Sequence, residues 1–204
     1  MPTVDQYLIP SLPASLPVKR YKADSCSPLV DQLRLASRAE AVAVVPLGIS
    51  LRLSENGFIE AVSLSTPDEV FQITIAKHSS HAALASVLGY QGVLFASFDM
   101  ARIAILLQRQ LGVNIRGVDL ATYQYIPSRQ PPAVYLAQKL LSNRVRGTAI
   151  CAIFYRKSNN DLCLRAWLSA WYAPLQPAVS PSQRTSRKQH RVEEHPRRRE
   201  GARR

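Results

Sequence analysis

The stretch that decides the fold is residues 41–75, which reads AVAVVPLGISLRLSENGFIEAVSLSTPDEVFQITI. Residues 41–53 are an apolar run rich in Val, which predicts a buried strand despite Pro46. The turn residues 54–57 follow, and residues 58–65 and 69–75 are predicted as two more strands. Because only short turns join these three strands, the stretch predicts an antiparallel meander.

Outside this stretch the pattern alternates between helix and strand. The strongest helical signal is DMARIAILLQRQL at residues 99–111, where apolar residues recur every three or four positions and Gly112 follows as a stop. Further helices are predicted over residues 29–38, 80–88, 133–141 and 161–172, and strands over residues 92–96 and 114–118. Strands first and alternation afterwards predict an α/β domain, with a mixed sheet flanked by helices.

Length and composition predict one domain with flexible ends. The chain has 204 residues, and 47% of them are hydrophobic. Residues 1–27 are expected to be an extended arm, 28–176 the domain, and 177–204 a disordered tail. No apolar run is long enough to suggest a membrane span, and the Pro-broken start does not resemble a signal peptide, so the nucleus or cytoplasm is expected. The odd cysteine count argues against a disulfide framework and a zinc site.

The net charge of +12 favours an acidic partner, and roughly half of it lies after residue 182. A basic tail of this kind either binds nucleic acid or directs nuclear import, or it is solvated disorder. Arg102, Arg109 and Arg116 likewise either face a nucleic-acid groove or lie on a solvated surface. The candidate nucleic-acid-binding residues in the tail are Arg184, Arg187, Lys188, Arg191, Arg197, Arg198 and Arg199.

Two stretches together resemble a known enzyme domain: residues 42–75 and the later VLFASFDMARIAILLQRQLGVNIRGVDLATYQ at residues 93–124. Their order and spacing are similar to the 3′–5′ exonuclease domain of the four-acid (DEDD) type. This domain is part of the ribonuclease-D-like superfamily, and the likeness points to its Egalitarian-like, exonuclease-domain-containing subgroup. The resemblance covers about residues 29–125. It implies a ribonuclease-H-like mixed sheet and hydrolysis of nucleic acid by two divalent metal ions.

The resemblance also indicates which metal ligands are replaced. The Asp and Glu of the family's Asp-x-Glu-Gly strand motif fall on Val45 and Leu47, ahead of a matching Gly48. The second-motif Asp is Asp99, and the last acid falls near Trp171. Two Mg²⁺ ions need several oxygen ligands, so Asp99 alone, as a vestigial catalytic and metal-binding residue, does not suffice. No cofactor is therefore expected, although an active enzyme would need Mg²⁺ or Mn²⁺.

Several of these residues also have structural interpretations. Asp99 and Asp119 each begin a predicted helix or helical turn, where a carboxylate caps backbone N–H groups. Trp167 and Trp171 are four residues apart on one predicted helix, which favours packing in the core over stacking on nucleic-acid bases.

Three hypotheses for the function remain open from the sequence. The first is a catalytically impaired exonuclease-like domain that binds RNA or DNA, or acts as a scaffold for a protein partner. The second is an active metal-dependent 3′–5′ exonuclease whose acids lie elsewhere in the chain. The third is a truncated or mispredicted relative without function, suggested by the weak resemblance after residue 126.

Overall fold

The computed structural model describes residues 3–4, 16–39, 44–76, 80–122, 154 and 159–173. The predicted helix at 133–141, Cys151 and the basic tail with its seven candidate residues lie outside the described residues. The helices and the single 3₁₀ turn of the described part are α1 (Pro28–Ala39), α2 (Ala82–Leu88), α3 (Met100–Leu111), η1 (Leu120–Thr122) and α6 (Asn159–Tyr172).

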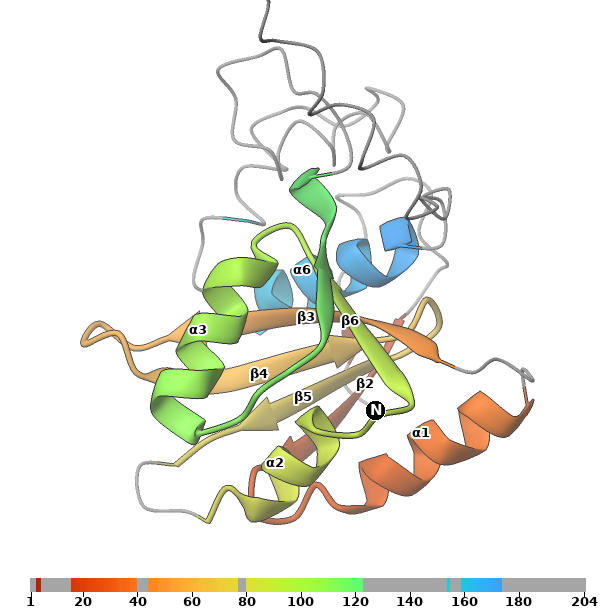
Figure 1. Ribbon diagram of the computed structural model, residues 1–204, viewed down its shortest axis with the longest axis horizontal. Coiled ribbons are helices and arrows are strands. Elements are labelled where there is room, and N and C mark those ends of the chain that lie inside the picture. The colour runs from red at the N-terminus through yellow and green to blue at the C-terminus, as the bar shows by residue number, and fades with distance from the viewer. Residues whose placement is uncertain are drawn as a thin grey trace, which may run out of the picture.

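The strands form one mixed sheet in the order β1-β2-β5-β4-β3-β6-β7 (Figure 1). Their bounds are β1 (Thr3–Val4), β2 (Leu16–Lys22), β3 (Val45–Leu53), β4 (Ile59–Ser65), β5 (Val70–Thr74), β6 (Val93–Ser97) and β7 (Gly117–Asp119). Strands β3, β4 and β5 pair antiparallel, which confirms the predicted meander. Strands β6 and β7 continue the sheet in parallel beyond β3, with α3 between them in the chain. The predicted α/β class, a mixed sheet flanked by helices, is confirmed.

Strand β2 lies inside the segment that the sequence assigned to an extended arm. It pairs in parallel with β5, and Val18 is opposite Val70. Leu16 and Val18 are buried, and so are Ala23 and Cys26 just after the strand. The folded domain therefore begins before residue 28. Pro17 and three basic side chains obscured the strand pattern of this short segment.

Pro46 is tolerated in β3, although β3 is a central strand, because of where the pairing with β4 begins. Val45 donates its backbone N–H to Gly92 O at 2.8 Å, on the β6 side. The backbone nitrogen of the next residue points to the opposite side in a strand. There β3 pairs with β4 only from Gly48 onward, opposite Ser65. Pro46 thus takes no hydrogen bond away from the ladder.

The two faces of the sheet carry different kinds of side chain. On one face Val45, Leu47 and Ile49 of β3 join an apolar core with residues of α1, α2 and α3, such as Leu33 and Leu107. Since side chains alternate along a strand, the intervening residues point to the other face. These residues are small or polar: Gly48, Ser50, Ser63, Ser65 and Gln72. Helix α6 covers this second face, away from α1 and α2 (Figure 1).

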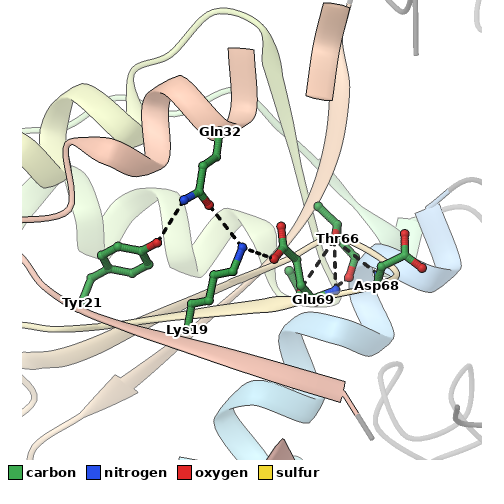
Figure 2. A network of polar contacts seen from close by, with 7 residues as sticks. Lys19, Tyr21, Gln32, Thr66, Asp68 and Glu69 are labelled. Atoms are coloured by element: carbon green, nitrogen blue, oxygen red, sulfur yellow. Dashed lines mark hydrogen bonds and ion pairs between the residues drawn. The ribbon is translucent and has the colours of Figure 1, made fainter. Parts of the chain in front are cut away.

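A polar network ties α1 and β2 to the turn between β4 and β5 (Figure 2). Lys19 Nζ lies 2.5 Å from Glu69 Oε2 and donates to Gln32 Oε1 at 3.5 Å. Gln32 in turn donates to the Tyr21 hydroxyl at 3.5 Å. Thr66 Oγ1 accepts the backbone N–H of Glu69 at 3.2 Å, which shapes the turn. The β4–β5 turn, which also accepts a hydrogen bond from Trp167 of α6, is thereby tied to α1 and β2.

Candidate functional site

Asp99 lies at the carboxyl end of β6, at the N-cap position of α3. Its carboxylate makes no side-chain capping hydrogen bond, so the predicted capping bond is absent. Burial raises the pKa of Asp99, Arg102 counteracts this, and the nearby charge of Asp119 raises the pKa further. Arg102 is a neighbouring cation, with Nη1 at 3.7 Å from Asp99 Oδ2. Asp99 is thus an exposed acid with a loosely placed counter-ion.

Asp119 lies beside Asp99 at the end of the neighbouring strand, because β6 and β7 are parallel and Ser97 is opposite Asp119. Its Oδ1 accepts the backbone N–H of Ala121 at 3.0 Å. This bond caps the first turn of η1 and agrees with the predicted capping role. The structure therefore brings two acids together at the carboxyl ends of adjacent parallel strands.

Val45 and Leu47, which the resemblance aligns with the first two metal ligands, belong to the apolar core. Their exposed fractions are 4% and 0%. Their side chains point to the face covered by α1, α2 and α3. Neither side chain has an oxygen or nitrogen atom, and neither reaches solvent. These two positions offer nothing to a metal ion.

Gly48 lies between them and faces α6, which approaches β3 very closely there. A methyl group at Gly48 would overlap Ala166 O and would lie 2.5 Å from Ala170 N. Only glycine leaves room for this contact between a helix backbone and a strand backbone. The two alanines on α6 are small enough to meet it.

Trp171, which the resemblance aligns with the last acid, packs against its own helix. Its ring stacks on Trp167, with centroids 5.6 Å apart and planes at 11°. Trp167 is 2% exposed and donates Nε1–H to Pro67 O at 2.9 Å. The stacked pair therefore fastens the end of α6 to the β4–β5 turn, in agreement with the packing interpretation.

Asp161 is an acid of α6 that sequence reasoning did not select as a site residue. It lies in the first turn of the helix and is only 6% exposed. Residues 161–164 and 166–170 are all buried, so α6 is enclosed on nearly every side. The sequence did offer one signal that could have drawn attention to Asp161: it lies four residues before Arg165 in a mostly apolar helix.

Arg165 is held largely inside the protein. It donates from Nε to Ser50 Oγ at 3.1 Å and from Nη1 to Phe154 O at 3.1 Å. A longer contact joins Nη2 to Leu51 O at 3.5 Å. Burial lowers the pKa of Arg165, and the negative charge of Asp161 counteracts this. The guanidinium connects α6 to β3 next to the close approach at Gly48.

These residues do not fit the pair of divalent ions that the exonuclease fold implies. Two ions require several carboxylate oxygens converging on one point. Among the residues that the structure describes, no three His, Cys, Asp or Glu side chains lie close enough together to hold a metal ion.

The remaining basic candidates of the described part are on the surface. Arg102 and Arg109 are exposed on α3, and Arg116 follows this helix. Arg116 Nη1 donates to Gln91 Oε1 at 3.4 Å, so it has a partner within the domain. In the part of the chain that is described, no helix has the length and apolar character needed to cross a membrane.

Comparisons with known proteins identify the fold. No protein-family model matches the sequence, and no curated protein matches it. Among solved structures the chain is similar to Escherichia coli RNase D, an exoribonuclease involved in structured RNA processing. The TM-score is 0.52 and the identity 10%, over 75% of this chain and 42% of that one. It is also similar to the Aedes aegypti Nibbler EXO domain, with TM-score 0.50 and 17% identity over 74% and 83% of the two chains.

The chain thus spans less than half the length of RNase D but most of the Nibbler domain. At these identities the likeness establishes the fold alone. That fold agrees with the one that the sequence resemblance implied, including the order of the meander, α3 and the parallel strands. The chain has the fold of a DEDD-type 3′–5′ exonuclease domain.

Proposed function

We propose that this exonuclease-like domain binds nucleic acid but does not hydrolyse it by the two-metal route. The observation that carries the proposal is the burial of Val45 and Leu47, at 4% and 0% exposure, in the apolar core. A carboxylate at either position would have to lie in that core, where a charge without a partner is very costly. The apolar residues are therefore built into the packing of the domain, and the acids cannot be restored there without cost.

Binding of nucleic acid is supported by charge and by the fold. The net charge of +12 attracts a polyanion, and α3 presents Arg102 and Arg109 on its exposed side. One protein of the same fold, RNase D, is an exoribonuclease that processes structured RNA. The choice between RNA and DNA is left to the binding experiment, and location in the nucleus or cytoplasm remains a prediction.

The proposed binding of nucleic acid is tested by titrating the protein with labelled single-stranded RNA and DNA at several salt concentrations. Phosphate contacts by basic side chains release counterions, so the affinity should fall steeply as salt rises. Removing residues 183–204 should weaken binding and reduce the salt slope. Tight binding that is insensitive to salt, or no binding at all, would contradict the proposal. The second outcome would favour the scaffold role with a protein partner.

The competing function is an active exonuclease that uses other acids. It is favoured by one observation: Asp99 and Asp119 end adjacent parallel strands, and the pKa of Asp99 is raised. An assay with Mg²⁺ or Mn²⁺ and 5′-labelled RNA or DNA distinguishes the two functions, with Asp99→Ala as the matched control. Shortening from the 3′ end that disappears in Asp99→Ala would establish the exonuclease and overturn the proposal.

A further inference from the structure

Two arginines flank the turn between α2 and β6, and each contacts a neutral side chain of that turn. Arg34 comes from α1, which lies beside α2 (Figure 1). Its guanidinium is over the ring of Tyr90, with Cζ 5.8 Å from the ring centroid. Arg116 directly precedes β7, and its Nη1 donates to Gln91 Oε1 at 3.4 Å. These four residues, from three segments of the chain, form what we call the Arg34–Arg116 surface.

The two neutral side chains of this surface are themselves fixed. Gln91 Nε2 donates to Gly89 O at 3.3 Å, which orients the amide that receives Arg116. The Tyr90 ring packs against the apolar core and lies close over Gly92, where an added methyl group would be 2.7 Å from the ring. An aromatic ring attracts a guanidinium through its face and takes up none of its N–H donors as a carboxylate would. Both arginines are therefore positioned without being neutralised by these contacts.

Both guanidiniums are accessible to an anion in solution. The Arg34 side chain is 56% exposed, and Arg116 is exposed as well. One acid is nearby: Asp31 Oδ1 lies 3.5 Å from Arg34 Nη1, but this side chain is 73% exposed. Ion pairs in contact with water are weak, so Asp31 reduces the positive charge of the surface only in part. The surface thus carries two positive charges against one negative charge.

We propose that the Arg34–Arg116 surface binds the phosphate backbone of nucleic acid. A guanidinium offers paired N–H donors that match the oxygen atoms of a phosphate group, and two guanidiniums on one surface can contact two phosphates of one strand. The inference rests on the proposed binding of nucleic acid and adds the place of contact. This place is at the amino ends of β6 and β7, whereas Asp99 and Asp119 lie at their carboxyl ends. The strand is therefore bound away from the two acids.

The test compares Arg34→Gln and Arg116→Gln with Arg20→Gln in titrations of the full chain with labelled single-stranded RNA and DNA. Each variant removes one positive charge, and the titrations are repeated at several salt concentrations. Arg34→Gln and Arg116→Gln should each weaken binding and reduce the slope of log affinity against log salt by about 1. Arg20 is the matched control, because it is exposed but lies opposite Gln72, on the sheet face under α6. Arg20→Gln should keep the wild-type slope.

Asp31→Asn changes the charge of the surface in the other direction. It removes the acid beside Arg34 and leaves both guanidiniums in place, so binding should become tighter at low salt. An affinity equal to or below that of the wild type would overturn the contact at Arg34. All four substituted side chains are exposed, so the melting temperatures of the variants should stay close to that of the wild type.

The outcomes separate this inference from the proposed function. If the wild type binds neither RNA nor DNA at any salt concentration, the proposed function fails and the inference fails with it. If the wild type binds and the three Arg→Gln variants lose equal affinity, the inference alone is overturned. If a poly-glutamate chain binds as tightly as RNA and loses as much affinity with Arg34→Gln, the occupant is an acidic protein segment, which also overturns the inference.

Discussion

The two faces of the sheet are packed in different ways. The face under α1, α2 and α3 is filled by large apolar side chains such as Leu47, Phe71 and Phe95. The face under α6 has glycine, serines and glutamine, and the helix is fastened there by polar contacts from Arg165 and Trp167. The first face supplies stability through buried area. The second has less buried apolar area, and α6 is held there by a close backbone approach and by specific hydrogen bonds.

The largest effect is expected when a charge is placed on the apolar face. Leu47→Asp should lower the free energy of unfolding by more than about 4 kcal/mol, because it buries an unpartnered carboxylate and leaves a cavity. The measurement is urea denaturation, and Leu47→Met is the matched control with a loss under about 1.5 kcal/mol. If Leu47→Asp folds with near wild-type stability, the position is open to solvent or to metal, contrary to the burial described.

A smaller effect is expected on the α6 face from Gly48→Ala. The added methyl group meets the α6 backbone, so the helix or the strand must shift, at a cost of about 1–3 kcal/mol. Trp167 and Trp171, the two tryptophans of the chain, report this shift through their fluorescence. In the control Gly92→Ala the methyl group meets the flexible side chain of Tyr90, and the tryptophan spectrum should not change. Equal spectra for the two variants would argue against the close approach.

A still smaller loss is expected from Trp167→Phe, which keeps an aromatic ring but removes the hydrogen bond to Pro67 O. One hydrogen bond contributes about 1 kcal/mol net. Urea denaturation should therefore show a loss of this order. Trp171→Phe is the control, since no hydrogen bond of Trp171 contributes to this contact with Pro67, and it should lose less. A larger stability loss in Trp171→Phe than in Trp167→Phe would mean that Trp171 contributes more to the docking of α6.

The smallest effect, and one of opposite sign, is expected from Asp99→Asn. The pKa of Asp99 is raised in the folded state, so folding favours its protonated form. The ionised form therefore lowers stability above the folded pKa, and this penalty disappears below the ordinary aspartate pKa. Asp99→Asn should raise the melting temperature at neutral pH, and the gain should vanish toward about pH 3. A destabilised variant at neutral pH would mean that the carboxylate stabilises the fold.

Local patterns predicted much of the fold, and contacts between distant segments account for what was missed. The meander followed from the turn residues 54–57, and α3 from its period and Gly112, which adopts φ 68°. Strand β2 was missed because its partner β5 lies about 50 residues later in the chain. Asp161 was overlooked because its importance comes from burial, which the helical period of α6 does not reveal.

For Val45 and Leu47, too, the sequence predicted one part and the structure supplied the other. The resemblance indicated that acids were replaced, but only the packed sheet shows that both side chains belong to the apolar core. The remaining candidates, Asp99 and Asp119, were interpreted as caps. A capping bond forms at Asp119 and none forms at Asp99, a difference of geometry that residue type does not predict.

The most direct measurement is therefore a nuclease assay of the purified full chain, with 5′-labelled single-stranded RNA and DNA in excess Mn²⁺. Asp99→Ala serves as the control. We predict that the wild type and Asp99→Ala both leave the substrates intact while the wild type still binds them. Products shortened from the 3′ end by the wild type, and absent with Asp99→Ala, would show that the chain is an active exonuclease and not only a binding domain.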